Sequence, residues 1–179
     1  MIVISSNAQE SMLQKSQRLS KWESGERFKF NYEMLLPSST DTIFPLLCPI
    51  LEYDWLNDWN CTMIYSESGV AEKNCIFYTS SGFPFYKRMT FQVIDYIPNN
   101  RIEFLIYINK VGSVRFSLSL TQIDMNKSKM VCDYVLTGHS KLGNKQLKKF
   151  REKEIEKQLK NLEMDITYWL QNKTKRPKK

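Results

Sequence analysis

The sequence has 179 residues but only one histidine, six glycines and four cysteines, and each low count excludes a class of site. A metal centre built on several histidines is excluded, and any Cys/His or Ser/His catalytic pair would have to use His139. His139 stands beside Ser140 at a predicted strand-to-helix junction, where a polar ring more often caps or faces solvent. No glycine-rich phosphate-binding loop is present, which disfavours a nucleotide-dependent enzyme.

The four cysteines include no Cys-x-x-Cys pair, so the sequence predicts neither a structural zinc site nor any other cofactor. Cys61, Cys75 and Cys132 fall in apolar, strand-like segments, where a free cysteine behaves as a small hydrophobic residue. No stretch approaches the ~20 apolar residues of a membrane span, and residues 1–4 are too short for a signal-peptide core. We therefore expect a cytoplasmic protein with reduced thiols and no stable membrane insertion.

The net charge of +7 raises the question of an anionic partner. Much of the excess lies at 141–151, the start of a predicted helix, and in the tail 173–179. Such segments are usually solvated ends, although attraction to RNA or a membrane surface is the alternative. Nucleic-acid binding across a sheet would need exposed aromatic residues, whereas Phe104 and Phe116 share strand faces with Ile and Leu. We expect no nucleic-acid partner, and a monomer or weak homodimer.

Strict alternation of apolar and polar residues begins after a polar N-terminal extension, 1–25, that is predicted to be flexible or loosely helical. The alternation predicts a first strand up to Pro37, and later runs bounded by turn residues predict an antiparallel meander. The expected strands are 28–36, 61–66, 74–80, 86–97, 101–109, 111–122 and 130–137. Between the first two, residues 38–41 fit a capping box, and prolines at 45 and 49 predict two short helices.

Apolar residues recur at three- and four-residue steps from about 144 to 171, which predicts one long helix of roughly 40 Å. A coiled coil is the competing interpretation, but the step from Phe150 to Ile155 breaks a heptad. The predicted fold class is α+β: a curved antiparallel sheet of about seven strands wraps around the C-terminal helix, with two short helices after strand one. We assign 26–172 to this helix-grip domain.

The element order, and the residues at 44–79, resemble a known group of proteins. The segment contains Cys48-Pro49, Glu52-Tyr53-Asp54-Trp55, Trp59 and 65–72 (YSESGVAE), and the similarity continues through 137–144. Together these resemble an uncharacterised bacterial and archaeal subfamily, with a CPxxEYDW…YSxSGxAE signature, of the SRPBCC or START-like superfamily of birch-pollen-allergen-like and polyketide cyclase-like proteins. Asn57-Asp58 stand where that subfamily usually has Pro-Gly, so the loop can differ in shape.

The bend at 48–55 combines a thiol, two carboxylates and aromatic rings, and the resemblance implies that it covers a cavity mouth. Glu52 or Asp54 could serve as a polar anchor, or as a general acid/base if burial raises its pKa. For Glu52 we favour the alternative of a helix cap and surface carboxylate, and we keep Asp54 as the candidate. Trp55 and Trp59 either line the mouth or fill the core.

The first functional hypothesis is a module that binds a hydrophobic or amphipathic small molecule, lipid or polyketide-like, between sheet and helix. Its expected ligand-binding residues are Asp54, Trp55, Trp59, Met63, Tyr65, Phe77, Phe91, Phe104, Phe116, Leu118, Tyr134, Leu159, Leu162 and Ile166. The second is a cyclase or dehydratase that transfers a proton from Asp54 or a tyrosine. The third is an interaction protein resembling activators of chaperone ATPases. A cavity carboxylate with a raised pKa would favour the enzyme.

Overall fold

The computed structural model describes residues 11–12, 14, 25–80, 88–149 and 152–178. Its strands form one seven-stranded antiparallel sheet in the order β1-β7-β6-β5-β4-β3-β2. The strands are β1 (Arg27–Leu36), β2 (Cys61–Tyr65), β3 (Ile76–Thr79), β4 (Met89–Ile97), β5 (Arg101–Ile108), β6 (Gly112–Asp124) and β7 (Lys127–Gly138). The predicted meander is confirmed, with strand ends shifted by up to three residues.

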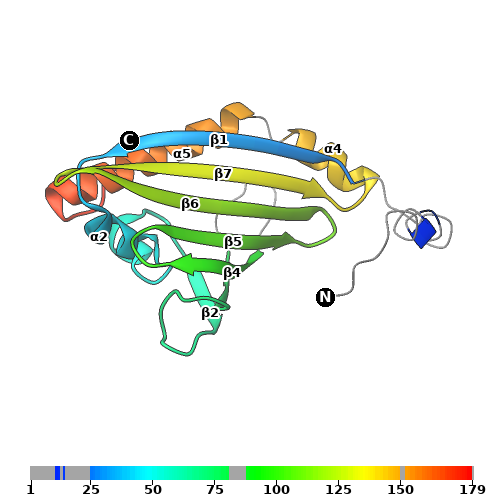
Figure 1. Ribbon diagram of the computed structural model, residues 1–179, viewed down its shortest axis with the longest axis horizontal. Coiled ribbons are helices and arrows are strands. Elements are labelled where there is room, and N and C mark those ends of the chain that lie inside the picture. The colour runs from blue at the N-terminus through cyan, green and yellow to red at the C-terminus, as the bar shows by residue number, and fades with distance from the viewer. Residues whose placement is uncertain (1–10, 13, 15–24, 81–87, 150–151, 179) are drawn as a thin grey trace.

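Alternating side chains give the sheet a buried face and a solvent face. In β6, Val114, Leu118 and Leu120 are buried while Arg115 between them is exposed. The sheet curves, and its buried face looks toward the helices (Figure 1). Burying one face of an antiparallel sheet fixes the strand register, because a slip of one residue would turn the apolar set toward water.

Three short helical segments separate β1 from β2: α2 (Thr40–Ile43), the 3-10 helix η1 (Phe44–Leu47) and α3 (Glu52–Trp55). The helical segments are interrupted between Leu47 and Glu52, around Pro49, as the sequence predicted. The capping box at 38–41 is wrong, because Ser39 occupies the N-cap and makes no side-chain capping bond. The Ser39 hydroxyl instead lies 3.1 Å from the hydroxyl of Thr42.

Two helices follow β7, α4 (Lys141–Lys149) and α5 (Glu152–Asn172). They cover the predicted long helix but begin three residues earlier, and residues 150–151 between them lie outside the described part. Helix α5, with 21 residues, is about 32 Å long and packs along β1, and α3 contacts it as well. The Tyr32 hydroxyl of β1 donates to Glu163 of α5 at 2.8 Å, which ties helix to sheet.

The basic tail, expected to be a solvated end, is largely exposed but attached to the domain. Arg176 pairs with the buried Asp165 of α5 at 2.5 Å, and its carbonyl accepts a 2.7 Å bond from the Asn57 amide. Lys178 lies 2.7 Å from Asp58. Of the N-terminal extension, only residues 11, 12, 14 and 25 are described, so its predicted character lies outside the described residues.

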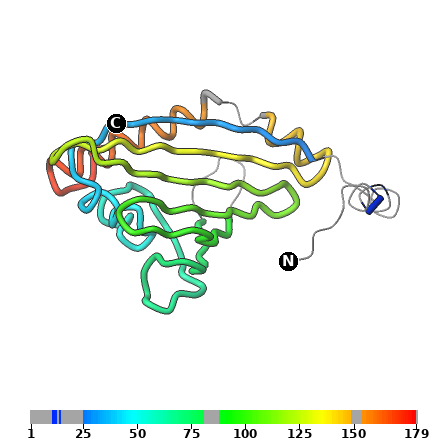
Figure 2. The backbone as a smooth tube through the Cα atoms, viewed as in Figure 1, coloured from blue at the N-terminus to red at the C-terminus, as the bar shows by residue number. Residues whose placement is uncertain are grey.

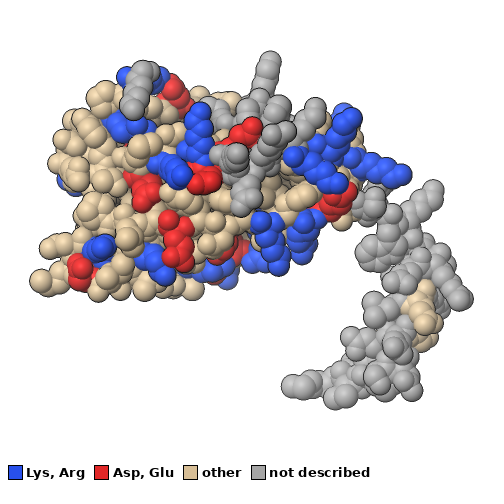
Figure 3. All heavy atoms as spheres, turned by 90° about the horizontal axis from the view of Figure 1, so that it is seen from above, with Lys and Arg blue, Asp and Glu red and all other residues tan. Residues whose placement is uncertain are grey.

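Charged residues lie mainly on the outside of the molecule. Figure 3 shows acidic and basic side chains interspersed, with basic ones gathered toward the end where α4 places Lys141, Lys145 and Lys148. On the solvent face of the sheet, Glu103 is paired with both Arg101 and Arg115. Burial alone would raise the pKa of Glu103, but the hydrogen bonds from these two arginines lower it below its ordinary value. No helix in the described ranges is long and apolar enough to span a membrane.

A candidate ligand cavity between the sheet and the last helix

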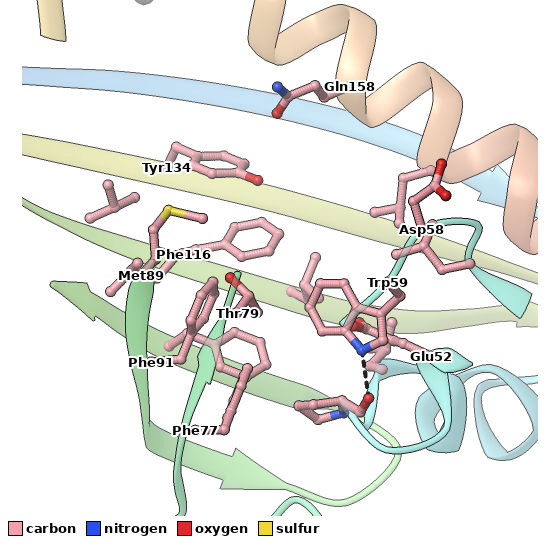
Figure 4. A pocket seen from close by; sticks show the side chains of 18 of the residues that line it. Glu52, Asp58, Trp59, Phe77, Thr79, Met89, Phe91, Phe116, Tyr134 and Gln158 are labelled. Carbon is pink, nitrogen blue, oxygen red and sulfur yellow. Dashed lines mark hydrogen bonds between the residues drawn. The ribbon is translucent and has the colours of Figure 1, made fainter. Parts of the chain in front are cut away.

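Two tryptophans fix the bend between η1 and β2. The Trp55 side chain is fully buried, and its indole nitrogen donates to the Leu46 carbonyl at 3.0 Å. The Trp59 indole donates to the Pro49 carbonyl at 2.7 Å (Figure 4). Because prolines interrupt the regular helical bonds here, the two indoles supply donors that the backbone lacks.

The two halves of the sequence signature are joined in space. The backbone amide of Ala71 donates to the Cys48 sulfur at 3.3 Å, so a hydrogen bond connects the loop after β2 to the bend. The Tyr53 hydroxyl bonds both backbone groups of Cys61, accepting at 2.8 Å and donating at 2.9 Å. All four cysteines are free and buried. Cys48 and Tyr53 therefore have structural roles.

Glu72 organises the loop 66–72, which projects from the sheet edge beyond β4 (Figure 2). Its carboxylate accepts bonds from the Ser66 hydroxyl at 3.1 Å and from the backbone amides of Glu67 and Ser68. The Ser68 hydroxyl and these backbone amides lower the pKa of Glu72. Gly69 adopts a φ of 79°, a region that favours glycine.

Replacing Glu72 with Gln should loosen this loop without unfolding the domain, because a neutral amide is a weaker acceptor for several donors than a carboxylate. We expect faster hydrogen exchange at the amides of residues 67 and 68, and the same change in the wild type when acid protonates Glu72. Unchanged exchange in the variant would show that the carboxylate does not hold the loop.

A cavity of about 460 Å³ lies between the sheet, α5 and the bend. Five rings from five neighbouring strands form its main wall, here called the aromatic ladder: Phe77, Phe91, Phe104, Phe116 and Tyr134. The register brings them together, with Phe77 opposite Phe91, Phe104 opposite Phe116 and Phe116 opposite Tyr134. Ring centroids lie 4.8 Å apart for Phe77 and Phe91 and 4.2 Å apart for Phe116 and Tyr134. The volume suits a small organic molecule, since ligand pockets usually span roughly 300–1,000 Å³.

Glu52, at the start of α3, lines the cavity. No described residue forms a hydrogen bond or ion pair with its carboxyl group, and burial raises its pKa from 4.5 to about 8. The residue is only partly buried by solvent accessibility, which is consistent with a carboxyl that borders a space large enough for water. A group with this pKa is largely protonated at neutral pH and can donate or accept a proton.

Two hydroxyl groups complete the polar lining. Thr79 is 1% exposed, and its Oγ1 is the buried side-chain oxygen or nitrogen among the described residues that lacks a hydrogen-bond partner. Figure 4 shows this hydroxyl among the rings of Phe91 and Phe116, with the Tyr134 hydroxyl directed into the cavity. Burial raises the pKa of Tyr134 well above its usual range, so the phenol stays neutral. Groups of this kind are available to a ligand.

Nine of the fourteen residues expected at the site line the cavity: the aromatic ladder with Trp55, Trp59, Leu118 and Leu162. Leu159 and Ile166 also face the sheet but are fully packed in the core, at 2% and 0% exposure. Met63 lies on the edge strand, partly buried against the core and outside the lining.

The predictions for Asp54 and Tyr65 are wrong. Asp54 is exposed and does not line the cavity. Residues two positions apart lie on different faces of a helix, so when Glu52 of α3 faces the cavity, Asp54 faces away from it. Tyr65 is 52% exposed and bonds Glu67 at 3.1 Å. A register shift between Met63 and Tyr65 breaks the alternation that had placed it inside.

Sequence reasoning missed Thr79 and ranked Asp54 above Glu52. Thr79 stands two residues after Phe77 on the same strand, so the two-residue period could have found it. The interpretation of Glu52 as a surface cap is wrong, and no sequence pattern separates it from Asp54. Gln158, which also lines the cavity, could have been inferred from Leu162 one helical turn away.

Comparison with known proteins supports the fold. No protein-family model and no curated protein matches the sequence. Among solved structures, a norcoclaurine synthase from Thalictrum flavum matches with a TM-score of 0.64 at 11% identity, over 86% of this chain and 100% of its own. Ara h 8.0201 matches with a TM-score of 0.60 at 14% identity, over 82% and 100% of the two chains. An aromatase/cyclase from Streptomyces matches with a TM-score of 0.53 at 10% identity, over 64% and 70%.

These likenesses agree with the predicted element order and with the curved sheet packed on a long C-terminal helix. The narrower resemblance to the subfamily with the CPxxEYDW signature stays a prediction. The chain has a helix-grip fold like that of these solved structures.

Proposed function

We propose that this protein binds a hydrophobic or amphipathic small molecule in the cavity between the sheet and α5. The observation that carries the proposal is a cavity of about 460 Å³ walled by the aromatic ladder and left unfilled by any side chain of the described residues. Protein interiors are otherwise close-packed, and an empty volume of this size lowers stability. A ligand would recover the contacts that the empty cavity lacks.

Filling the cavity should abolish binding. Leu162→Trp places an indole in the lining from α5, and we expect it to weaken binding of the neutral probe Nile red by at least about tenfold, since a bulky side chain then occupies the ligand volume. Met164→Trp is the matched control, because Met164 lies two residues along the same helix and is 45% exposed. Fluorescence titration measures both. Equal affinity in the wild type and Leu162→Trp would show that the probe binds elsewhere.

Native mass spectrometry of the protein purified from its own host tests the same proposal without a chosen probe. A hydrophobic compound retained at near-stoichiometric occupancy and lost in Leu162→Trp supports the binding module. An unliganded protein that also fails to bind Nile red argues against it.

A second candidate function is proton transfer by an enzyme of the cyclase or dehydratase sort. The observation that favours it is Glu52, an unpaired carboxyl facing the cavity with a pKa of about 8. A general acid or base works best when its pKa lies near the operating pH. Host extract incubated with wild type should then show a change in metabolites that extract incubated with Glu52→Gln does not. The same change with both proteins would rule out Glu52 as the proton-transfer group.

A further inference from the structure

The polar side chains of the cavity are all neutral or acidic. Glu52 and Asp58 carry carboxyl groups, and the remaining polar lining comes from amides, hydroxyls and two indoles: Asn57, Gln158, Thr79, Tyr134, Trp55 and Trp59. Among the described residues that line it, there is no lysine, arginine or histidine. The lysines and arginines of the described residues therefore lie outside the lining, and its described part has no basic side chain to neutralise an anionic ligand.

Two of these polar groups lack a partner. The Glu52 carboxyl contacts no donor or cation in the described chain, and Thr79 Oγ1 is buried without a hydrogen bond. Asp58 differs, because Lys178 lies 2.7 Å from its carboxylate. The Trp59 indole nitrogen is also occupied, by the Pro49 carbonyl at 2.7 Å. The unmet hydrogen-bonding capacity of the cavity is thus clearest at Glu52 and Thr79.

We propose that the cavity takes an apolar molecule with one protonated amine, the ammonium group lying against Glu52 and the hydrocarbon body along the aromatic ladder. The inference rests on the proposed binding function and names the class of ligand. An ammonium supplies three donors and a positive charge; the Glu52 carboxylate can accept from it, and Thr79 and Tyr134 offer further acceptor oxygens in the same lining. Aromatic faces such as that of Trp59 add cation–π attraction.

Other head groups fit less well. A ligand carboxylate would place a second acid beside Glu52, and one of the two would have to stay protonated at a cost in free energy. An alcohol can bond a neutral Glu52, but it brings no charge and fewer donors to the available acceptors. Burying an ion pair is favourable only when its remaining hydrogen bonds are satisfied, and the Thr79 and Tyr134 hydroxyls are the neutral acceptors that the lining offers for this.

Binding of an ammonium should release a proton. In the free protein Glu52 is mostly protonated at neutral pH, since its pKa is about 8, and a cation at contact distance favours its ionised form. Amine affinity should therefore rise with pH until Glu52 is ionised in the free protein, near pH 8. Alcohol affinity should instead fall through the same range.

Several other titratable groups lie near Glu52 or share its cavity. Cys61 of β2 is close enough to interact electrostatically with both Glu52 and Cys48. Asp58, in the loop after α3, and Tyr134 of β7 line the same cavity as Glu52. Burial raises the pKa of both Cys61 and Tyr134, so these two stay neutral in the range tested. Helix α5 presents Gln158 and Leu162, and its buried Asp165 is paired with Arg176.

The test is isothermal titration calorimetry of the full chain with three ligands of matched shape: 4-phenylbutylamine, 4-phenylbutan-1-ol and 4-phenylbutanoate. We expect the amine to bind at least about tenfold more tightly than the carboxylate and more tightly than the alcohol at neutral pH. Titrations in buffers of different ionisation enthalpy should show release of about one proton per amine bound and none for the alcohol.

Glu52→Gln should weaken amine binding by at least about tenfold, change alcohol binding little and remove the proton release. Asp54→Asn is the matched control, since it removes an exposed carboxylate from the same helix, and it should behave as wild type. Retained alcohol binding shows that the Gln variant is folded.

The possible results distinguish failure of the amine assignment from failure of the proposed binding function. Tighter binding of the carboxylate or alcohol, or an amine preference that survives in Glu52→Gln, overturns the amine assignment while leaving the binding module intact. If neither these ligands nor Nile red binds the wild-type protein, the proposed binding function fails with it.

Discussion

Replacing Trp55 with Ala should lower the free energy of unfolding by about 3–5 kcal/mol, the usual range for truncating a large buried aromatic residue. Trp55 is 0% exposed, and it gives its indole hydrogen bond to the Leu46 carbonyl at 3.0 Å. The substitution removes apolar contacts, leaves a cavity and deprives a backbone acceptor of its donor. Denaturant unfolding followed by circular dichroism measures the loss.

Trp55→Phe separates the two contributions, because it keeps most of the packing and removes the hydrogen bond. It should cost less than Trp55→Ala but more than Tyr107→Ala, a truncation of a ring that is 51% exposed. A loss below about 1 kcal/mol for Trp55→Ala would mean that the bend is not held by this side chain.

Glu52→Gln should make the folded protein more stable at alkaline pH, in contrast to most substitutions. Because the pKa of Glu52 is raised on folding, from 4.5 to about 8, the folded state keeps a proton that the unfolded state releases between these values. Stability contributed by this proton is present below about pH 4.5, falls as pH rises and is gone above about pH 8. The Gln variant has no such proton to lose.

The size of the effect follows from the shift. One pKa unit corresponds to about 1.4 kcal/mol, and solvent screens part of the shift because the Glu52 side chain is only partly buried. We therefore expect a relative gain of about 2 kcal/mol for Glu52→Gln between mildly acidic and alkaline pH. Asp54→Asn should follow the wild-type pH profile. Urea unfolding at a series of pH values measures all three proteins, and parallel curves for wild type and Glu52→Gln would contradict the raised pKa.

If Glu52 governs both the pH profile of stability and the selectivity for ligands, the same group links the two properties. An amine that ionises Glu52 in the complex should then stabilise the protein most at alkaline pH, where Glu52 contributes least to the stability of the free protein. The buried Glu52 carboxyl would then lower the stability of the ligand-free protein at alkaline pH and select amines over other ligands. Carboxyl groups held near neutral pKa values are often functional for this reason.

The sequence by itself determined the strands and the order of the elements. Alternation in 28–36 and 111–122 is strong enough to define strands, because only one side chain in two can face the core. The same rule placed Phe77, Phe104 and Phe116 on the buried face. Their contact across strands depends on register, which turns and the neighbouring strands set together.

Tertiary structure decided the site. The direction of Glu52 depends on how one turn of helix docks between Pro49 and Trp59, and a four-residue helix carries no periodic pattern that could reveal its buried face. The exposure of Tyr65 follows from an irregularity in β2 that the sequence did not signal. The Thr79 hydroxyl lacks a hydrogen-bond partner because of where all its spatial neighbours lie, and these come from distant parts of the chain. Local patterns specify which side chains face inward, whereas a cavity and an unpaired carboxyl arise only from the way distant segments meet.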